Sequence, residues 1–599
     1  MVENRDMTRP ILIVSMLAIS AFQTAQASEP GAVPEFCVED KCVRSGENTG
    51  YQFPSVPTSE SNAQLKAVAT FHSVSLYWDE PSASEKNEAL VRFRPLGGGP
   101  WRQGLSLWFD SRDSSKVPYG SLQYRGSLVE LEPNTSYEIE ALALDSGKLA
   151  KAQIKTWSEK FPVGQTVTLP AQSSSTLRIT QSGSPSGYRL YTAASGGSTI
   201  DGNNKVDELV VISASYVILR GVTLRNSRIS GIYLTSSAHH VVIEDNDISY
   251  FGRADPVMPQ FGCKDAAGIT TENSTWPANS GVRQIVIQNN RIHHPNFDSN
   301  SWDEPRQAST NCGPPAGTSH PAGARAVYFK DTAGNHVIRY NRIYSDLSRM
   351  FDDGIGGGQN FSVRGPYGSD SDIYGNFVSH VWDDAIESEG ANQNVRIYNN
   401  YTELTMVAVA AAPVSIGPLY VFRNVATKGV RGPTSIGGEG WFFKTRNKSA
   451  DGSISGIMLG SGRIYLFHNT LYRTSLSDSV KQMLSLDEIS CVNIISRNNV
   501  MNSRSAISSK FIPMAYSNFD NDLYPKDHAI WSEEEKNGIQ ADAVYDGTGV
   551  SGRFALRLGS PGQDAAVPIP NFNDRHRGSA PDAGAQELDA NALVFGERK

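Results

Sequence analysis

Two short stretches of this sequence place several carboxylates close together. They are MFDDGIGGG, with Asp352 and Asp353, and VWDDAIESEG, with Asp383, Asp384, Glu387 and Glu389. Like charges about 5 Å apart repel by roughly 0.8 kcal/mol in water and by several times more in a partly buried cleft. A hard cation such as Ca²⁺, a proton held by one carboxyl as in a glycosidase, or nearby Arg and Lys side chains would compensate this repulsion. A solvated acidic face paired with basic neighbours is the simpler alternative.

Strand alternation predicts which of these side chains share a face. Alternate residues of a strand point the same way. Ile386 is apolar and should face a core, so Asp383, Glu387 and Glu389 should point outward. Asp384 should lie at the bend before the strand.

An alignment of FDDGI with WDDAI predicts how the two stretches meet. It stacks Asp352 over Asp383 on neighbouring strands, which lie about 4.8 Å apart. It also stacks Asp353 over Asp384. At least four carboxylates would then form one patch.

Basic residues on strand-like segments are the candidate partners of this patch. Most of them lie opposite an aromatic residue and should therefore face away from a core. They are Lys330 in AVYFKD, Arg423 in LYVFRN, Lys444 and Arg446 in GWFFKTRN, and His468 in YLFHNT. Each of them alone is more often an ordinary solvent-facing strand residue.

Residues 56–158 have the pattern of a small antiparallel β-sandwich. Runs such as HSVSLYWDE and EALVRFRPL alternate apolar and polar residues between turn signals. LEPNTSYEIEA resembles the tyrosine corner of fibronectin type III domains, with Tyr137 as the corner residue. The resemblance implies a domain of that kind with Trp78 in its core. No residue here indicates catalysis, so we expect a spacer or docking module.

From about residue 165 to 505 an asparagine recurs between two apolar, strand-like runs. The instances are Asn246, Asn290, Asn341, Asn376, Asn400, Asn424, Asn469 and Asn499. Repeats of at least ~20–25 residues with variable insertions are typical of a solenoid. Because β-branched residues dominate and helical periodicity is almost absent, the turns should consist of strands. The asparagines should form a buried ladder at a tight bend.

This pattern resembles the right-handed parallel β-helix of the pectate-lyase-like superfamily, over more than half of the chain. The expected fold class is therefore all-β, with a small antiparallel β-sandwich followed by a right-handed parallel β-helix at 165–505. The remaining segment, 506–599, includes SPGQD and PDAGAQE and resembles the closing segment of many exported bacterial β-helix proteins. It predicts a structural cap and tail, since solenoid ends need covering.

The resemblance also implies a chemistry for the acidic patch. Asp383, Asp384 and Glu387, in D-D-x-x-E spacing, resemble the Ca²⁺-binding D-D-x-x-D pattern of one β-helix pectate lyase family, although Glu replaces the last Asp. That family uses a Lys from a later turn as base, which implies Lys444 here and Lys330 as second choice. Such an enzyme removes the proton α to a uronate carboxylate while a cation stabilises the developing charge.

These arguments define three sets of candidate residues. The catalytic candidates are Lys444, Asp383, Asp384, Glu387, Asp353 and Arg423, and the candidate Ca²⁺ ligands are Asp352, Asp353, Asp383, Asp384 and Glu387. The candidate substrate-binding residues are Lys330, Arg446, Trp302 and His468.

The leading hypothesis is a Ca²⁺-dependent lyase acting on an acidic polysaccharide, and two alternatives stay open. A glycoside hydrolase would use two carboxyls among Asp353, Asp383, Asp384 and Glu387 as an acid/base pair. The G-H-G and R-x-K motifs of polygalacturonase-like β-helices are absent, which disfavours that family. A polysaccharide-binding protein or adhesin would use the acids only to hold a structural ion.

The N-terminal sequence predicts that the protein is exported from the cytoplasm. Residues 1–27 contain an apolar run that ends in Ala25-Gln26-Ala27, which is typical of a Sec-type signal peptide, and 28–55 have the composition of a linker. We therefore expect a secreted or periplasmic bacterial protein. No later apolar run is long enough for a transmembrane helix. The net charge of −8 without a Lys/Arg stripe argues against a nucleic-acid partner, and we expect a monomer that binds a polysaccharide.

Two long insertions, 251–281 and 294–324, are rich in Gly and Pro and are predicted to be binding loops, with Trp276 and Trp302 available to stack on sugar rings. Cys263 and Cys312 lie in these insertions and could join them. Of the five cysteines, Cys37 and Cys42 could close a small loop, and Cys491 should be buried in a strand.

Overall fold

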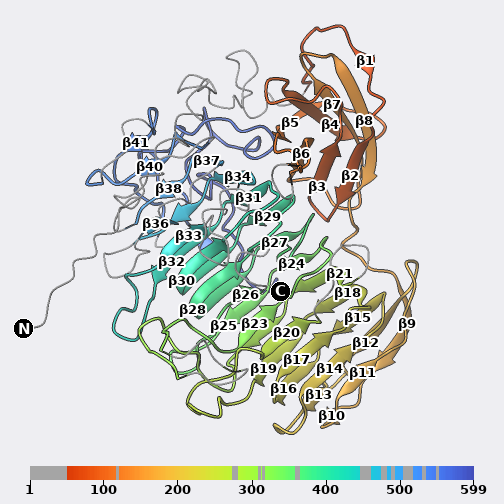
Figure 1. Cartoon of the computed structure of the whole chain (residues 1–599), viewed down its shortest axis with the longest axis vertical. Coiled ribbons are helices and arrows are strands. Elements are labelled where there is room, and N and C mark those ends of the chain that lie inside the picture. Colours follow the sequence, from red (N-terminus) through yellow and green to blue (C-terminus); the bar gives the residue numbers. More distant parts are fainter. Residues whose placement is uncertain are drawn as a thin grey trace, which may run out of the picture.

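A computed structural model describes residues 50–115, 120–272, 281–307, 312, 317–357, 364–445, 461–473, 482–486, 493–503, 517–528, 534–547 and 552–598. Every element of regular secondary structure assigned within these residues is a β-strand, which confirms the predicted all-β class. They form a small antiparallel unit beside a long parallel solenoid (Figure 1). Several predictions fall outside the described residues: the signal peptide, most of the linker, Trp276, Arg446, Cys37, Cys42 and Cys491.

The N-terminal unit is a sheet of eight strands that is antiparallel, as predicted, except at one edge. Its strand order is β1-β8-β7-β4-β5-β6-β3-β2, with β1 and β8 parallel and the other pairs antiparallel. Trp78 is fully buried in its core, and the Tyr137 hydroxyl accepts a hydrogen bond from the Glu132 amide at 2.9 Å. The strands are β1 Ser59–Glu60, β2 Leu65–Ala69, β3 Val74–Trp78, β4 Ala89–Pro95, β5 Arg102–Asp110, β6 Gln123–Leu128, β7 Ser136–Ala143 and β8 Lys148–Lys155.

The solenoid is a parallel β-helix, as predicted, and its first wall is a parallel sheet of 12 strands. They are β9 Val163–Thr168, β12 Tyr188–Thr192, β15 Val217–Arg220, β18 His239–Glu244, β21 Arg283–Gln288, β24 Val337–Arg339, β27 Asp372–Tyr374, β29 Val395–Tyr398, β31 Leu419–Phe422, β34 Ile464–Phe467, β37 Ile494–Arg497 and β39 Asn518–Phe519.

The remaining walls form one sheet of 21 strands, in which most turns contribute two strands on either side of a corner. They are β10 Gln172–Ser173, β11 Leu177–Ile179, β13 Thr199–Asp201, β14 Glu208–Ile212, β16 Thr223–Ser227, β17 Ser230–Leu234, β19 Asp247–Phe251, β20 Ala267–Thr271, β22 Arg291–His293, β23 Arg325–Tyr328, β25 Arg342–Tyr344, β26 Ile355–Gly356, β28 Phe377–Glu387, β30 Tyr401–Ala411, β32 Val425–Gly429, β33 Trp441–Thr445, β35 Thr470–Leu471, β36 Gln482–Leu486, β38 Val500–Met501, β40 Leu523–Tyr524 and β41 Ile539–Gln540. Two of them, β28 and β30, run through the corner without a break.

The predicted asparagine ladder is confirmed, and it explains how the walls join. Each ladder side chain donates from Nδ2 to Oδ1 of the next, at 2.8–3.1 Å, from Asn246 through Asn499 to a final acceptor on Asp522. The residue before a ladder asparagine takes a left-handed conformation, for example Asn399 (φ 52°) and His468 (φ 54°). This single residue turns the chain between strands, and the ladder satisfies the polar groups that the turn buries.

Replacing Asn400 by alanine should lower the free energy of unfolding by about 3 kcal/mol, because several buried partners lose a hydrogen bond. The partners include the Asn376 amide and side chain, the Ile373 carbonyl and the Asn424 side chain. Chemical denaturation followed by circular dichroism measures the change. The exposed Asn591→Ala is the control, and equal stabilities for the two variants would contradict a structural ladder.

The C-terminal segment differs from the predicted cap. Parallel pairing continues past 505 through β39, β40 and β41. The tail then runs back along the solenoid, so that Gly596 donates its amide to the Gly375 carbonyl and Arg598 lies over the ring of Tyr340, the residue after β24 (Figure 1). Within the tail, Phe572 packs on aromatic rings on the outer side of the solenoid, including Phe422 and Phe467. The tail therefore covers a side of the solenoid.

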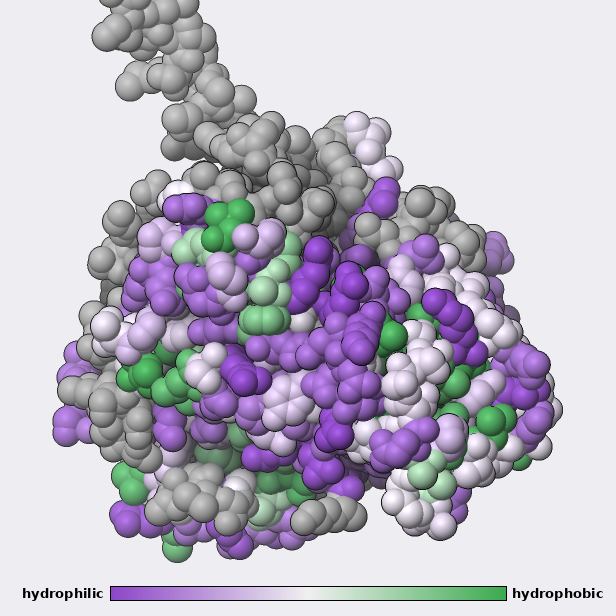
Figure 2. Space-filling model, turned by 90° about the horizontal axis from the view of Figure 1, so that it is seen from below, coloured by the Kyte–Doolittle hydropathy of each residue, from purple (hydrophilic) through white to green (hydrophobic). Residues whose placement is uncertain are grey.

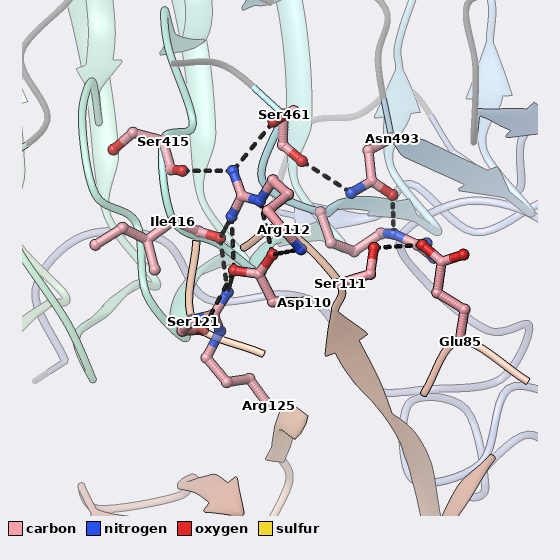
Figure 3. Close-up of polar contacts among 11 residues, drawn as sticks. Glu85, Asp110, Ser111, Arg112, Ser121, Arg125, Ser415, Ile416, Ser461 and Asn493 are labelled. Carbon is pink, nitrogen blue, oxygen red and sulfur yellow. Dashed lines mark hydrogen bonds and ion pairs between the residues drawn. The ribbon is translucent and has the colours of Figure 1, made fainter. Parts of the chain in front are cut away.

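Buried polar contacts fix the sandwich against the solenoid. The fully buried Arg396 of β29 pairs with Asp372 and donates to the hydroxyls of Ser75 and Ser127, at 2.8 and 3.1 Å. Arg112 of the sandwich donates to the carbonyl oxygens of Ser415 and Ile416, each at 2.8 Å (Figure 3). The two units therefore share a specific polar interface.

The outer surface is largely hydrophilic on the face seen from below, where apolar residues form only small separate patches (Figure 2). Within the described part of the chain, no helix has the length and apolar character needed to cross a membrane.

Candidate active site and cation site

The predicted acidic residues meet at the corner of the larger sheet, on β28 and on the turn before it. At this corner two consecutive residues of a turn face the core, such as Ala385 and Ile386, and Ala408 and Val409 in the next turn. Such a pair interrupts strand alternation, so the residues that flank it on both sides point outward.

This corner corrects the prediction for Asp384. We expected it at a bend before the strand, but it lies within β28 and joins Glu387 and Glu389 on the outside. The reason is the core-facing pair Ala385–Ile386, which brings positions three apart onto one face.

The predicted stacking of the two acidic stretches is present. The Asp383 amide donates to the Asp352 carbonyl at 3.0 Å. The Asp384 amide donates to Oδ1 of Asp353 at 3.3 Å. Ile355 pairs with Ile386, as the alignment predicted, but Phe351 pairs with Val381 and not with Trp382, so the register shifts by one residue between these two pairs.

Six carboxylates lie in this cluster, and each is at most 6% exposed. They fall into two groups, and within each group the potential ligand oxygens lie within 4.8 Å of one another. The groups are Asp352, Asp353 and Asp383, and Asp384, Glu387 and Glu389.

Two cationic side chains pair with the cluster. Arg325 of β23 contacts Asp352 at 3.0 Å and Asp353 at 2.6 Å. Lys444 of β33 places Nζ 2.7 Å from Asp384 and 3.4 Å from Glu389. Each cation therefore pairs with acids of one group.

A third basic side chain lies on the second insertion. Nε2 of His320 is 3.6 Å from Asp383. The side chain of His320 is half exposed, and partial desolvation lowers its pKa below the usual value. His320 therefore adds little positive charge to the cluster.

The cluster has more negative charge than its partners compensate. Asp383 Oδ1, Asp384 Oδ1 and Glu389 Oε2 are buried and have no hydrogen-bond partner among the described residues. A buried carboxylate oxygen without a partner is costly unless it binds a proton or a cation. The arrangement therefore provides places for one or the other.

Burial and mutual repulsion shift the pKa values of the acids upward. The pKa values of Asp352 and Glu389 rise to about 7, mainly because burial disfavours the charged form. The pKa values of Asp383 and Glu387 rise well above the usual values for the same reason and because of neighbouring carboxylates. The carboxylates hold the pKa of Lys444 well above its usual value, against the effect of burial.

The donor set fits a hard divalent cation. Ca²⁺ takes six to eight oxygen ligands at irregular geometry, and carboxylates are its preferred protein ligands. The group of Asp384, Glu387 and Glu389 offers such carboxylate oxygens. Asp384 and Glu389 each have a carboxylate oxygen without a hydrogen-bond partner among the described residues. In the other group, Arg325 already pairs with two of the three acids.

The other predicted site residues are placed differently. Trp302 packs beside the corner, on Met406, Val407 and Ala410. Lys330 lies at the edge of the cluster, with Nζ 5.5 Å from the centre of the Tyr328 ring.

Two predicted residues lie away from the cluster. Arg423 donates to carbonyl oxygens of the C-terminal tail, at Ala585 and Phe572. His468 is buried beneath the same tail, and its Nε2 accepts hydrogen bonds from Nδ2 of Asn498 and of Asn573. The contacts of Arg423 and His468 therefore attach the C-terminal tail to the solenoid.

Sequence reasoning assigned no role to three residues of the cluster. Glu389 follows Glu387 by two positions and had been placed on the outward face, which is a signal for the same site. In ARAVYF, Arg325 stands directly before an alanine and a β-branched residue, as Asp384 does in DDAI. This shared pattern could have identified Arg325. His320 lies in an insertion, and no local pattern marks it.

Described residues of the two insertions contact one another beside the site. Cys263 and Cys312 are joined by a disulfide, as predicted. The buried Arg306 pairs with Asp255 of the first insertion and donates to the Ala322 carbonyl of the second, two residues after His320. These contacts hold the segment that carries His320 against the corner.

Fold and site together define a parallel β-helix protein with a buried acidic cluster on one outer corner. No family model matches the chain, and no curated protein matches it by sequence.

Three solved structures show remote likeness. The pectate lyase Pel9A is 14% identical with a TM-score of 0.38, and the match covers 71% of this chain and 86% of that one. The catalytic domain of a GH87 α-1,3-glucanase in complex with nigerose is 10% identical with a TM-score of 0.27, covering 80% and 91%. The catalytic domain of Agl-KA is 11% identical with a TM-score of 0.26, also covering 80% and 91%.

Proposed function

We propose that this protein is an exported polysaccharide lyase that cleaves an acidic polysaccharide by β-elimination with the help of Ca²⁺. The observation that carries the proposal is the cluster of six buried carboxylates in contact with Lys444, with oxygens of Asp384 and Glu389 left unpartnered. The secreted or periplasmic location and a monomeric state belong to the same proposal.

Asp384, Glu387 and Glu389 would hold the cation, with Asp383 and Asp353 beside them. A bound Ca²⁺ would neutralise the uronate carboxylate of the substrate and stabilise the negative charge that develops next to it. Arg325 stays paired with Asp352 and Asp353 and keeps their charges compensated.

Lys444 is the proposed base that removes the proton α to the uronate carboxylate. In the structure its neighbours favour the ammonium form, because they raise its pKa. Base function therefore requires that the charges of Asp384 and Glu389 be neutralised first. The same two carboxylates are proposed cation ligands, so base activation and cation binding are coupled. Lys444 would then take the α proton, a double bond would form between the α and β carbons, and the glycosidic oxygen would leave the β carbon and take a proton from water.

A retaining glycoside hydrolase is the second candidate, and one observation favours it. The acids lie close together, with potential ligand oxygens within 4.8 Å in each group, and retaining enzymes use carboxyls about 5–5.5 Å apart. The raised pKa of Glu387 would keep it protonated as a general acid.

A panel of acidic and neutral polysaccharides, incubated with the mature protein with and without chelator, tests the proposal. Absorbance at the unsaturated-uronate band should rise together with new reducing ends, and both should disappear on chelation. Asp383→Ala and Asp384→Ala should lose the activity. Reducing ends without absorbance would establish the hydrolase instead, and neither signal would favour a binding protein.

A further inference from the structure

One turn beyond the acidic cluster, the same outer corner becomes apolar, and two turns beyond it carries Trp441 and Lys444. Asp384 pairs with Val407 of β30, and Val407 pairs with Trp441 of β33. The parallel column runs from Glu387 through Ala410 to Lys444. The column that starts at Asp384 therefore passes to apolar side chains in steps of about 4.8 Å along the solenoid, whereas the column that starts at Glu387 ends in a lysine.

Trp302 completes this apolar surface from the second insertion. Its ring packs with Trp441 on Met406, Val407 and Ala410, and both tryptophans remain partly exposed. We call the two tryptophans with these three residues the aromatic wall.

Contacts with Arg431 and His320 hold Trp302 in place. Its amide donates to the Arg431 carbonyl at 3.2 Å, and its ring centre lies 4.7 Å from that of His320. His320 in turn contacts Asp383 at 3.6 Å. The wall and the acidic cluster are therefore continuous through His320.

Among the described residues, the cations beside the wall are already paired with acids. The two nearest described cations are engaged, since Lys444 pairs with Asp384 and Glu389, and Arg431 pairs with Asp303 at 2.9 Å. Indole rings bind the apolar C–H face of a sugar, and an uncharged sugar loses no hydration of a carboxylate there.

We propose that the aromatic wall is a subsite for an uncharged sugar residue of the substrate, so that the preferred polymer alternates uronate and neutral sugars. The proposal rests on the proposed function, because the acidic cluster fixes the uronate. From Asp384 to Trp441 the distance along the solenoid is two strand spacings, about 10 Å, which is comparable to the length of a disaccharide.

The test compares wild type with Trp302→Ala and Trp441→Ala on a uronate homopolymer and on polymers that alternate uronate with a neutral sugar. Wild type should prefer an alternating polymer. Each variant should raise KM for it about tenfold with little change in kcat, and should lose the preference. Tyr233→Ala is the matched control, because Tyr233 lies on the outer face of β17, four strand pairings from Glu387.

Retardation of each protein in gels that contain the polymers gives a second readout that needs no turnover. If the wall is a subsite but the elimination chemistry is wrong, the alternating polymer still retards wild type more than the two variants. If turnover is eliminative but neither variant changes KM or retardation, the wall proposal is wrong. A wild-type preference for the homopolymer, or no tryptophan-dependent retardation by any polymer, would also overturn it.

Discussion

Lys444→Ala should lower kcat on the uronate polymer by about 10²–10⁴-fold, because a positioned general base contributes that much. Lys444 contacts both Asp384 and Glu389, and within the described residues it is the lysine that pairs with this cluster. Lys330, the second choice, lies over the Tyr328 ring and pairs with none of the six acids in the described contacts. Initial rates at saturating substrate and Ca²⁺ measure the effect.

Lys428→Ala is the matched control for this variant. Lys428 lies on β32, and its 3.9 Å pair with Glu403 is partly exposed, so its loss should leave kcat unchanged. Circular dichroism should show that both variants are folded. Full activity of Lys444→Ala would exclude Lys444 as the base. The carboxylates of the acidic cluster would then be the catalytic groups, as in a glycoside hydrolase.

The cation-free protein should become less stable as pH rises from about 4.5 to 7. Burial raises the pKa of Glu389 from 4.5 to about 7 and that of Asp352 from 3.8 to about 7. In this window the folded protein keeps protons that the unfolded chain releases, so stability is present at low pH and is lost as pH rises through the folded pKa. The shift of Glu389 corresponds to about 3 kcal/mol. Thermal unfolding in chelator at a series of pH values measures the loss.

Glu389→Gln should reduce this pH dependence, because the buried group then carries no charge at any pH. Glu403→Gln on the outer part of β30 is the control and should keep the wild-type profile. Saturating Ca²⁺ should restore stability at pH 8 in wild type by about 3 kcal/mol at a hundred times Kd. An unfolding temperature of the chelated protein that rises between pH 5 and 8 would contradict the charge balance derived for the cluster.

Local sequence patterns predicted much of the fold. The asparagine ladder was readable because every turn repeats the same strand–bend–strand pattern, and each ladder asparagine, such as Asn376 or Asn424, occupies the predicted place. The stacking of Asp352 on Asp383 followed from aligning two adjacent turns, since parallel strands keep register. These features depend on short-range order along the chain.

The features that were missed depend on the corner and on contacts far apart in the sequence. Asp384 was predicted at a bend before the strand, because strand alternation cannot identify a core-facing pair such as Ala385–Ile386. His320 reaches Asp383 from a long insertion whose path is fixed by Arg306. The course of the C-terminal tail depends on aromatic surfaces that become exposed only when the solenoid has formed.

Calorimetric titration of Ca²⁺ into chelator-treated mature protein tests whether the acidic cluster is a cation site. We expect saturable binding that is lost in Asp384→Asn and Glu389→Gln and kept in Glu403→Gln. Binding that persists in both cluster variants, or no binding of Ca²⁺ by wild type at millimolar concentration, would contradict this expectation.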